Sequence, residues 1–293
     1  MASDAAAATA REKKIAASRI AKFAWYAVMT VIGLVFAVPF LWVLGSSFKF
    51  DNEIFRFVYP LSIRTFVPQI PTLKNYMEIF VELGIGRSLL NSLFVAGALA
   101  AGTLAVTSLA AYAFARLDFP GKNALFIGSL STMFVPFEAV VVPLYLVTRF
   151  LGMRNTLSSL VIPWLSSPFG VFLLRQFITD IPRELDEAAM IDGCSTLGIY
   201  WNIILPNAKP ALVTLGLIQF LAGWDAFFWP LVVITSPKKQ VIQVAIASLT
   251  TREMIFWGRT FAACTVAVLP VLVLFLFLQK YYIEGVTMTG IKG

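Results

Sequence analysis

Few side chains in this sequence could support acid–base, nucleophilic or metal chemistry. Its 293 residues include no histidine, and its two cysteines are Cys194 and Cys264. Histidine catalysis and histidine metal ligation are therefore excluded. No nucleophile lies beside a candidate base, and no acidic or cysteine cluster has the spacing of metal ligands. We expect no catalytic residue, no metal site and no disulfide in this chain.

Nucleotide hydrolysis has no motif in the sequence either. The pattern Gly-x-x-x-x-Gly-Lys-Ser/Thr, whose backbone amides cradle phosphates, does not occur. Gly121 and Lys122 come nearest, but Asn123 follows them and the leading glycine is missing. We therefore expect this chain to be no ATPase and to carry no cofactor of its own.

Two carboxylates stand alone within long apolar segments, Glu138 and Asp225. An ionisable group inside a membrane segment is a functional candidate. Gln219 and Trp224 lie close to Asp225 in sequence, so these residues and Glu138 are candidates to line a path for a polar solute such as a sugar. Two alternatives stay open. Asp225 and its aromatic neighbours could form an interfacial belt, and Glu138 could pair with a neighbouring helix.

The most organised polar stretch is 180–206, for which local rules predict a helix, a turn and a second helix. Asp180 is a favourable cap for the first helix, and Gly193 suits the left-handed residue that ends it. Ser195 can cap the second helix, which is expected to stop at Pro206. One face of the first helix carries Leu185, Ala188 and Ala189. Such a short amphipathic helix outside the membrane is suited to a groove on another protein.

The rest of the chain is too apolar for a soluble domain. Apolar residues make up 59% of it and charged residues 13%, whereas about a quarter of a soluble domain is charged. The net charge of +7 is too small and dispersed to indicate nucleic acid binding. About 20 residues cross a hydrocarbon core as a helix. Six segments qualify, at about 23–48, 88–115, 124–148, 156–174, 211–235 and 261–278. We expect an all-α polytopic membrane protein with six transmembrane helices.

Three local features refine this expectation. Pro163 and Pro168 should kink the fourth segment, which is then a bent packing helix, a hinge or a pore-lining helix. Small residues over 96–102 predict close helix packing in the second segment. The stretch 49–87 mixes basic and acidic residues and is expected to be a solvated, mixed-charge surface.

Charge also suggests an orientation. Five basic residues precede the first segment and Lys49 alone follows it closely, which favours a cytoplasmic N-terminus. Six spans then return the C-terminus to the same side. The expected organisation is a cytoplasmic basic tail (1–22), a transmembrane domain (23–278), a cytoplasmic loop (175–210) between spans four and five, and a cytoplasmic C-terminal tail (279–293).

The loop resembles the EAA motif of permease subunits in binding-protein-dependent ATP-binding-cassette importers. That motif is Glu-Ala-Ala, three residues, Gly, nine residues, Ile, one residue and Leu-Pro. The matching positions here are Glu187, Ala188, Ala189, Gly193, Ile203, Leu205 and Pro206. Looser matches over 110–116 and 289–293 are similar to the carbohydrate branch, specifically the maltose-type second permease.

The resemblance implies that this chain forms half of the pathway of a sugar importer in a bacterial inner membrane. Its expected partners are a second permease subunit in a heterodimer, two ATPase subunits that hold ATP and Mg, an extracytoplasmic solute-binding protein and membrane lipid. The loop helix would dock on an ATPase. The alternative is an ion- or proton-coupled secondary transporter, whose signature would be paired intramembrane charges and inverted repeats. The sequence offers neither.

Overall fold

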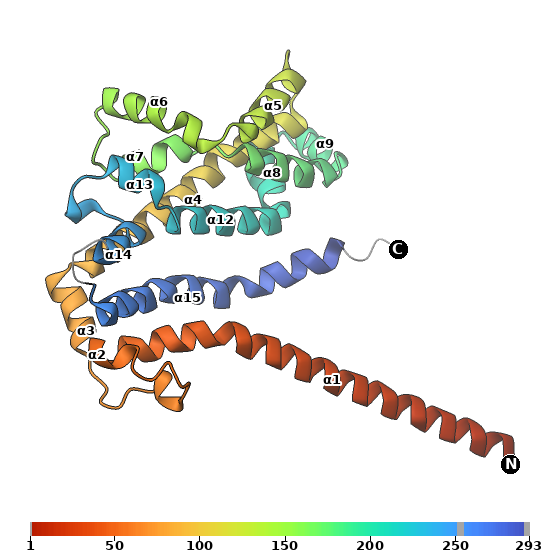
Figure 1. Cartoon of the computed structure of the whole chain (residues 1–293). Coiled ribbons are helices and arrows are strands. Elements are labelled where there is room, and N and C mark those ends of the chain that lie inside the picture. The colour runs from red at the N-terminus through yellow and green to blue at the C-terminus, as the bar shows by residue number, and fades with distance from the viewer. Residues whose placement is uncertain (1, 251–254, 290–293) are drawn as a thin grey trace. The chain divides into compact units, whose positions relative to one another are not determined.

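The chain is helical throughout the part that the structure describes. This computed structural model describes the backbone of residues 2–250 and 255–289, and side chains over 21–250 and 255–277. Every regular element in those residues is a helix (Figure 1), so the all-α expectation is confirmed. Nearly all of the tail expected at 1–22, and all of that at 279–293, lies outside the described side chains.

Single turns and loops join the helices, and the loop between α2 and α3 spans residues 55–73. The α-helices of the described residues are α1 (Ala2–Ser47), α2 (Asp51–Ile54), α3 (Lys74–Met77), α4 (Ile85–Arg116), α5 (Lys122–Ser131), α6 (Phe137–Phe150), α7 (Ser158–Val161), α8 (Pro168–Asp180), α9 (Glu184–Ile191), α10 (Thr196–Ile199), α11 (Leu205–Asn207), α12 (Lys209–Trp224), α13 (Phe228–Val233), α14 (Ile242–Thr250) and α15 (Trp257–Thr289). A π-helical stretch, Tyr200–Ile204, joins α10 to α11.

Three helices are long and apolar enough to cross a bilayer by themselves: Ala21–Ser47, Ile85–Arg116 and Trp257–Phe277. Three further pairs of helices meet the same test only if each bent pair is counted as one span. The described residues therefore hold between three and six candidate spans, and the six predicted from sequence are the upper limit.

Prolines lie at the breaks in three of the segments that are expected to span the membrane. The segment expected at 124–148 is not one continuous helix, because Val135 is extended before Pro136 and the flanking helices differ by 105°. The kink expected in the fourth segment is confirmed, with a bend of 48° ahead of Pro168. The segment expected at 211–235 is also divided, since Pro230 would clash with the carbonyl of Ala226 in a continuous helix.

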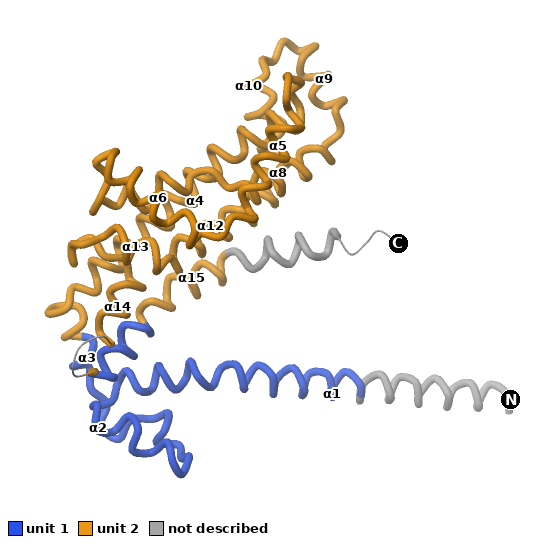
Figure 2. The backbone as a smooth tube through the Cα atoms, turned by 45° about the horizontal axis from the view of Figure 1, so that its top comes forward, with its two compact units in different colours: residues 1–76, 256–265 blue, residues 77–255, 266–293 orange. Residues whose placement is uncertain are grey.

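Figure 2 shows the two compact units into which the chain divides. Unit 2 comprises residues 77–255 and 266–293, and in it α4 packs against α8 and α12. A Cβ added at Gly223 would lie 3.0 Å from the Cα of Ala96, and one added at Gly102 would lie 2.4 Å from Leu165 Cδ2. The small residues over 96–102 therefore do permit close packing, as predicted.

Unit 1 comprises residues 1–76 and 256–265, and its loop is tied to the C-terminal end of α1. The Lys49 ammonium is fully buried and donates to the carbonyls of Arg64 and Thr65 at 2.7 and 2.8 Å. Burial lowers the pKa of Lys49, and the nearby Glu53 carboxylate opposes that shift. Asn75 Nδ2 donates to the carbonyls of Ser47 and Lys49 at 2.9 and 2.8 Å.

The solvated mixed-charge surface expected at 49–87 is therefore wrong for Lys49 and Glu53. Glu53 is buried, and its carboxylate accepts the backbone N–H of Gln69 at 2.6 Å. Asp51, although exposed, accepts the N–H of Gly258 at 2.7 Å. These charges bind backbone groups where the loop closes onto the end of α1, so the amides and carbonyls buried there have partners.

Gly45 is the point where this loop touches α1 most closely. A Cβ at Gly45 would lie 1.8 Å from the carbonyl oxygen of Phe66, so we expect Gly45→Ala to push the loop away and to cost about 1–3 kcal/mol. Thermal unfolding in detergent and protease sensitivity of the loop measure this. Gly97→Ala is the matched control, because nothing lies within 4 Å of its added Cβ. Equal stability of the two variants would contradict the contact.

Candidate functional site

The loop over 180–206 folds as two helices, and the turn and one of the caps predicted for it lie where the sequence placed them. Gly193 has φ +83° just after α9, and Ser195 caps α10 by accepting the N–H of Gly198 at 3.1 Å; both predictions are confirmed. The cap predicted at Asp180 is wrong, because α8 continues to Asp180 and α9 begins only at Glu184. The second helix also passes Pro206, since the wider π-helical stretch ahead of it relieves the clash of the proline ring.

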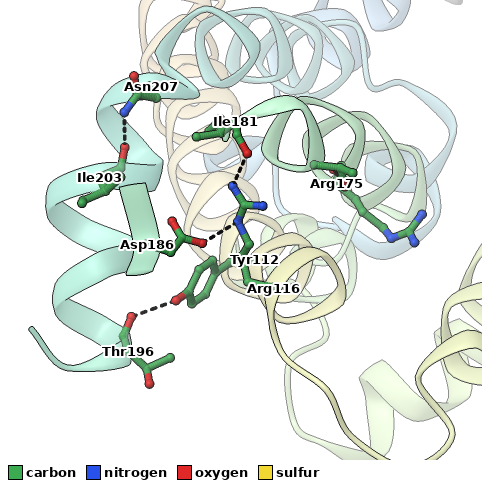
Figure 3. A network of polar contacts seen from close by, with 9 residues as sticks. Tyr112, Arg116, Arg175, Ile181, Asp186, Thr196, Ile203 and Asn207 are labelled. Carbon is green, nitrogen blue, oxygen red and sulfur yellow. Dashed lines mark hydrogen bonds and ion pairs between the residues drawn. The ribbon is translucent and has the colours of Figure 1, made fainter. Parts of the chain in front are cut away.

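A buried ion pair fixes α9 to the end of α4 (Figure 3). Arg116 Nε lies 2.8 Å from Asp186 Oδ2, and the two side chains are only 5% and 9% exposed. Arg116 Nη2 also donates to the carbonyl of Ile181 at 2.6 Å. Arg116 is the last residue of α4, so one guanidinium joins that long helix both to α9 and to the turn before it.

Two tyrosines extend the contact to the second helix of the loop. Tyr112 Oη donates to the carbonyl of Thr196 at 3.0 Å, and the hydroxyls of Ser108 and Tyr200 lie 2.7 Å apart. The Tyr112 and Tyr200 rings contact each other with centroids 5.4 Å apart. Because Ser108, Tyr112 and Arg116 are spaced four residues apart, one face of α4 supplies all three groups.

An apolar core completes this attachment. Ala189 from α9 is buried in one cluster with residues of the second helix, of α4, of α8 and of α12; its other members are Ala111, Tyr112, Ala115, Leu174, Ile178, Ile199, Tyr200, Ile204, Ala208, Ala211 and Leu215. The loop therefore packs as part of unit 2 and does not hang from it.

The opposite face of the loop is open. Glu187, Ala188 and Gly193 are exposed, and so are large apolar side chains at Ile191 and Trp201. Of the remaining motif residues, Ile203 and Leu205 are half-buried against the apolar core, Pro206 is exposed and Ala189 is buried. The motif thus divides into positions that hold the loop to the chain and positions that face outward.

A separate cavity of about 460 Å³ lies among α4, α6, α8, α12 and α13. Its walls carry aromatic side chains, including Phe137, Trp164 and Phe228, and a few polar groups. Gln219 is one of these, and its Nε2 donates to Ser167 Oγ at 3.2 Å. Aromatic faces combined with a few hydrogen-bonding groups are typical of small-molecule sites.

The structure does not gather the four candidate path residues together. Gln219 lines the cavity, but Trp224 is 2% exposed and stacks on Phe220 with ring centroids 6.0 Å apart. Asp225 is exposed just beyond the end of α12, and Glu138 is exposed in the first turn of α6. Neither carboxylate is among the residues that line the cavity.

Sequence reasoning missed the Arg116–Asp186 pair. A signal for half of it was present, because Asp186 precedes Ala189 by three residues and so shares its helix face. A carboxylate on the packed face of an amphipathic helix needs a buried partner. The identity of that partner depended on which helix end the loop meets, and spacing alone does not give it.

Comparison with known proteins agrees with this architecture. Residues 108–287 match the family model for the binding-protein-dependent transport system inner membrane component. The arabinooligosaccharides transport system permease protein AraQ of Halalkalibacterium halodurans is 33% identical over 89% of this chain and 93% of its own length. The sulfoquinovosyl glycerol transport system permease protein SmoH of Agrobacterium fabrum is 33% identical over 87% of this chain and 88% of its own.

A solved structure shares the fold. A chain of a bacterial ABC transporter involved in the import of the acidic polysaccharide alginate superimposes with a TM-score of 0.77 over 90% of this chain and 97% of that chain, at 21% identity. The family match covers more than half of the sequence, and the relatives above are sugar transport permeases that align along most of their length. This chain therefore belongs to the inner membrane components of binding-protein-dependent transport systems, as its EAA motif indicated, and to the carbohydrate branch of ABC-importer permeases, as the looser sequence matches indicated.

Proposed function

We propose that this chain is one of two permease subunits of an ATP-driven sugar importer and that its loop at 180–206 couples it to a separate ATPase. One observation carries the coupling proposal: the loop is attached rigidly on one side and open on the other. Arg116 and Asp186 hold α9 to α4 through a buried ion pair, whereas Glu187 and Ile191 face outward.

Rigid attachment matters because work must pass from a soluble ATPase to helices in the bilayer. A loop that could move independently of α4 would absorb a displacement without moving the helix. In this chain, Arg116 and Tyr112 bond to both helices of the loop, and α4 packs on α8 and α12. A push on the exposed face of α9 would then move this part of unit 2 as one body.

The outward face also has chemistry suited to a protein groove. Exposed Ile191, Leu197 and Trp201 supply apolar area, and Glu184 and Glu187 supply negative charge at its edge. An apolar groove with basic groups at its rim would complement this surface. ATP and Mg would be held by that ATPase and not by this chain.

The rest of the assembly follows from the family and from the topology argued above. The proposed importer has a second permease, as a heterodimer partner, two ATPase subunits and an extracytoplasmic solute-binding protein. The six apolar segments of the sequence give six crossings, with both termini and the loop at 180–206 in the cytoplasm. The names of the relatives, which include transport of arabinooligosaccharides, support a mono- or oligosaccharide as the solute.

We further propose that the cavity beside Gln219 forms part of the sugar path. Trp164 and Phe137 offer aromatic faces to the apolar side of a sugar ring, and Gln219 and Ser167 offer hydrogen bonds to its hydroxyls. The isolated carboxylates at Glu138 and Asp225 then lie outside this part of the path.

Reversing the charge of Glu187 tests the docking face. In the assembled transporter, Glu187→Lys is expected to abolish sugar uptake and the stimulation of ATP hydrolysis by loaded binding protein, because it places a cation against the proposed basic rim. Uptake and ATPase activity in proteoliposomes measure this. Asp180→Lys, the same charge change at the exposed end of α8, should leave both intact. Normal uptake by Glu187→Lys would argue against docking.

The ion pair predicts a strong thermodynamic coupling between its partners. Arg116→Leu alone leaves the Asp186 carboxylate buried and unpaired, and should lower the free energy of unfolding by about 3–5 kcal/mol. Arg116→Leu with Asp186→Leu should recover most of that loss, since neither variant side chain is charged. Thermal unfolding of the two single variants and the double variant gives the coupling energy. Strictly additive losses would show that the two side chains do not interact.

The cavity predicts a binding defect that leaves ATP hydrolysis alone. Loss of one hydrogen bond in Gln219→Leu should raise KM for sugar uptake about two- to tenfold without changing basal ATPase activity. Asp225→Asn, which lies outside the cavity, serves as the control and should keep the original KM. An unchanged KM in Gln219→Leu would place the path elsewhere.

A further inference from the structure

The loop of unit 1 folds back along α1 instead of extending away from it. The carbonyl of Phe66 touches α1 at Gly45, where any Cβ would collide with it. Val58 and Leu61 from the loop line an open hollow together with Val38 and Trp42 from α1, and Leu61 keeps most of its surface exposed. Residues 55–66, which we name the return segment, therefore lie beside a helix that is apolar enough to cross a bilayer.

The depth of this contact follows from helix geometry. Residues 23–48 carry no charge, with Lys22 before them and Lys49 after them. About 20 helical residues cross the hydrocarbon core, so a core within this stretch ends between Trp42 and Phe48. The return segment contacts α1 at Trp42, through Phe55, and at Gly45, through Phe66, so it lies near that end of the core.

The outer face of the return segment suits that level. Tyr59, Leu61 and Ile63 are 93%, 71% and 79% exposed. These three large side chains alternate along the segment, and their exposure to water is unfavourable. Aromatic and aliphatic side chains are instead stabilised in the interfacial zone of a bilayer.

The charges of unit 1 point to a specific headgroup. Lys49, Glu53 and Asp51 are engaged with backbone groups, as described above. Arg56 and Arg64 are exposed, and their guanidinium carbons lie 5.5 and 5.6 Å from the centroid of the Phe57 ring. Among the described residues neither arginine forms a salt bridge. A guanidinium binds phosphate through paired hydrogen bonds, so two free ones beside an apolar face complement a phospholipid.

We propose that the return segment is an interfacial anchor, which inserts Tyr59, Leu61 and Ile63 into the leaflet at the C-terminal end of α1 and holds phospholipid phosphates with Arg56 and Arg64. The occupant of this surface is lipid. It fixes the depth of α1 in the membrane and requires no contribution from the loop that carries the EAA motif.

A depth-sensitive label tests this anchor in the assembled transporter. We would place an environment-sensitive fluorophore at Leu61→Cys in a background with Cys194→Ser and Cys264→Ser, and reconstitute it in nanodiscs whose lipids carry bromine on their acyl chains. The label at 61 should be strongly quenched and its emission shifted to the blue. A label at Asp118→Cys, an exposed position between α4 and α5, should be quenched little. Equal, weak quenching at both positions would overturn the proposal.

A second arm distinguishes lipid from protein as the occupant. Arg56→Gln with Arg64→Gln should reduce quenching at position 61, whereas Arg154→Gln, in the loop before α7, should not. If the label at 61 is unquenched in nanodiscs and responds only when the solute-binding protein is added, the surface binds that protein and the lipid proposal is wrong. Since the label reports depth and not uptake, failure here leaves the proposed coupling function untouched.

Discussion

The attachment of the EAA loop depends on one buried ion pair, between Arg116 at the end of α4 and Asp186 in α9. An ion pair in an apolar setting adds little net stability, but loss of either member is costly because the other remains charged and buried. The ion pair therefore constrains the position of α9. Arg116 also donates to the carbonyl of Ile181, so the same side chain holds both α9 and the turn before it. The exposed face of α9 is thereby presented in one orientation.

Polar side chains also satisfy buried backbone groups elsewhere in unit 2. Prolines at 136, 168 and 230 lie at breaks in three of the apolar segments, and each break frees backbone groups that the chain must satisfy. Ser167 does so for the start of α8, and the indole of Trp229 donates to the carbonyl of Ser159 at 2.8 Å. The cavity beside Gln219 lies where these broken helices meet. The breaks therefore leave irregular backbone beside the cavity.

In unit 1, buried charged side chains hold the loop at the C-terminal end of α1. Its loop buries an ammonium and a carboxylate against backbone groups, and the loop lies against the helix at a glycine. This leaves arginines and apolar side chains on its surface. Because the buried charged side chains form hydrogen bonds with backbone groups, the loop can lie close to the bilayer without leaving those carbonyls or amides unsatisfied.

Several features could be predicted from the amino-acid sequence alone: the class of protein, the apolar segments, the proline kink ahead of Pro168, the left-handed Gly193 and the cap at Ser195. These features depend on composition or on neighbours within four residues, so they can be predicted without knowledge of the tertiary structure. Other features became visible only in the folded chain. Asp186 pairs with Arg116, and Lys49 is buried. Gly45 lies against the carbonyl of Phe66, and Gln219 lines a cavity that Trp224 does not line. Those outcomes depend on the rotation and register of helices far apart in the chain, which the apolar pattern of a membrane helix scarcely constrains, because lipid-facing and packed positions carry the same residue types.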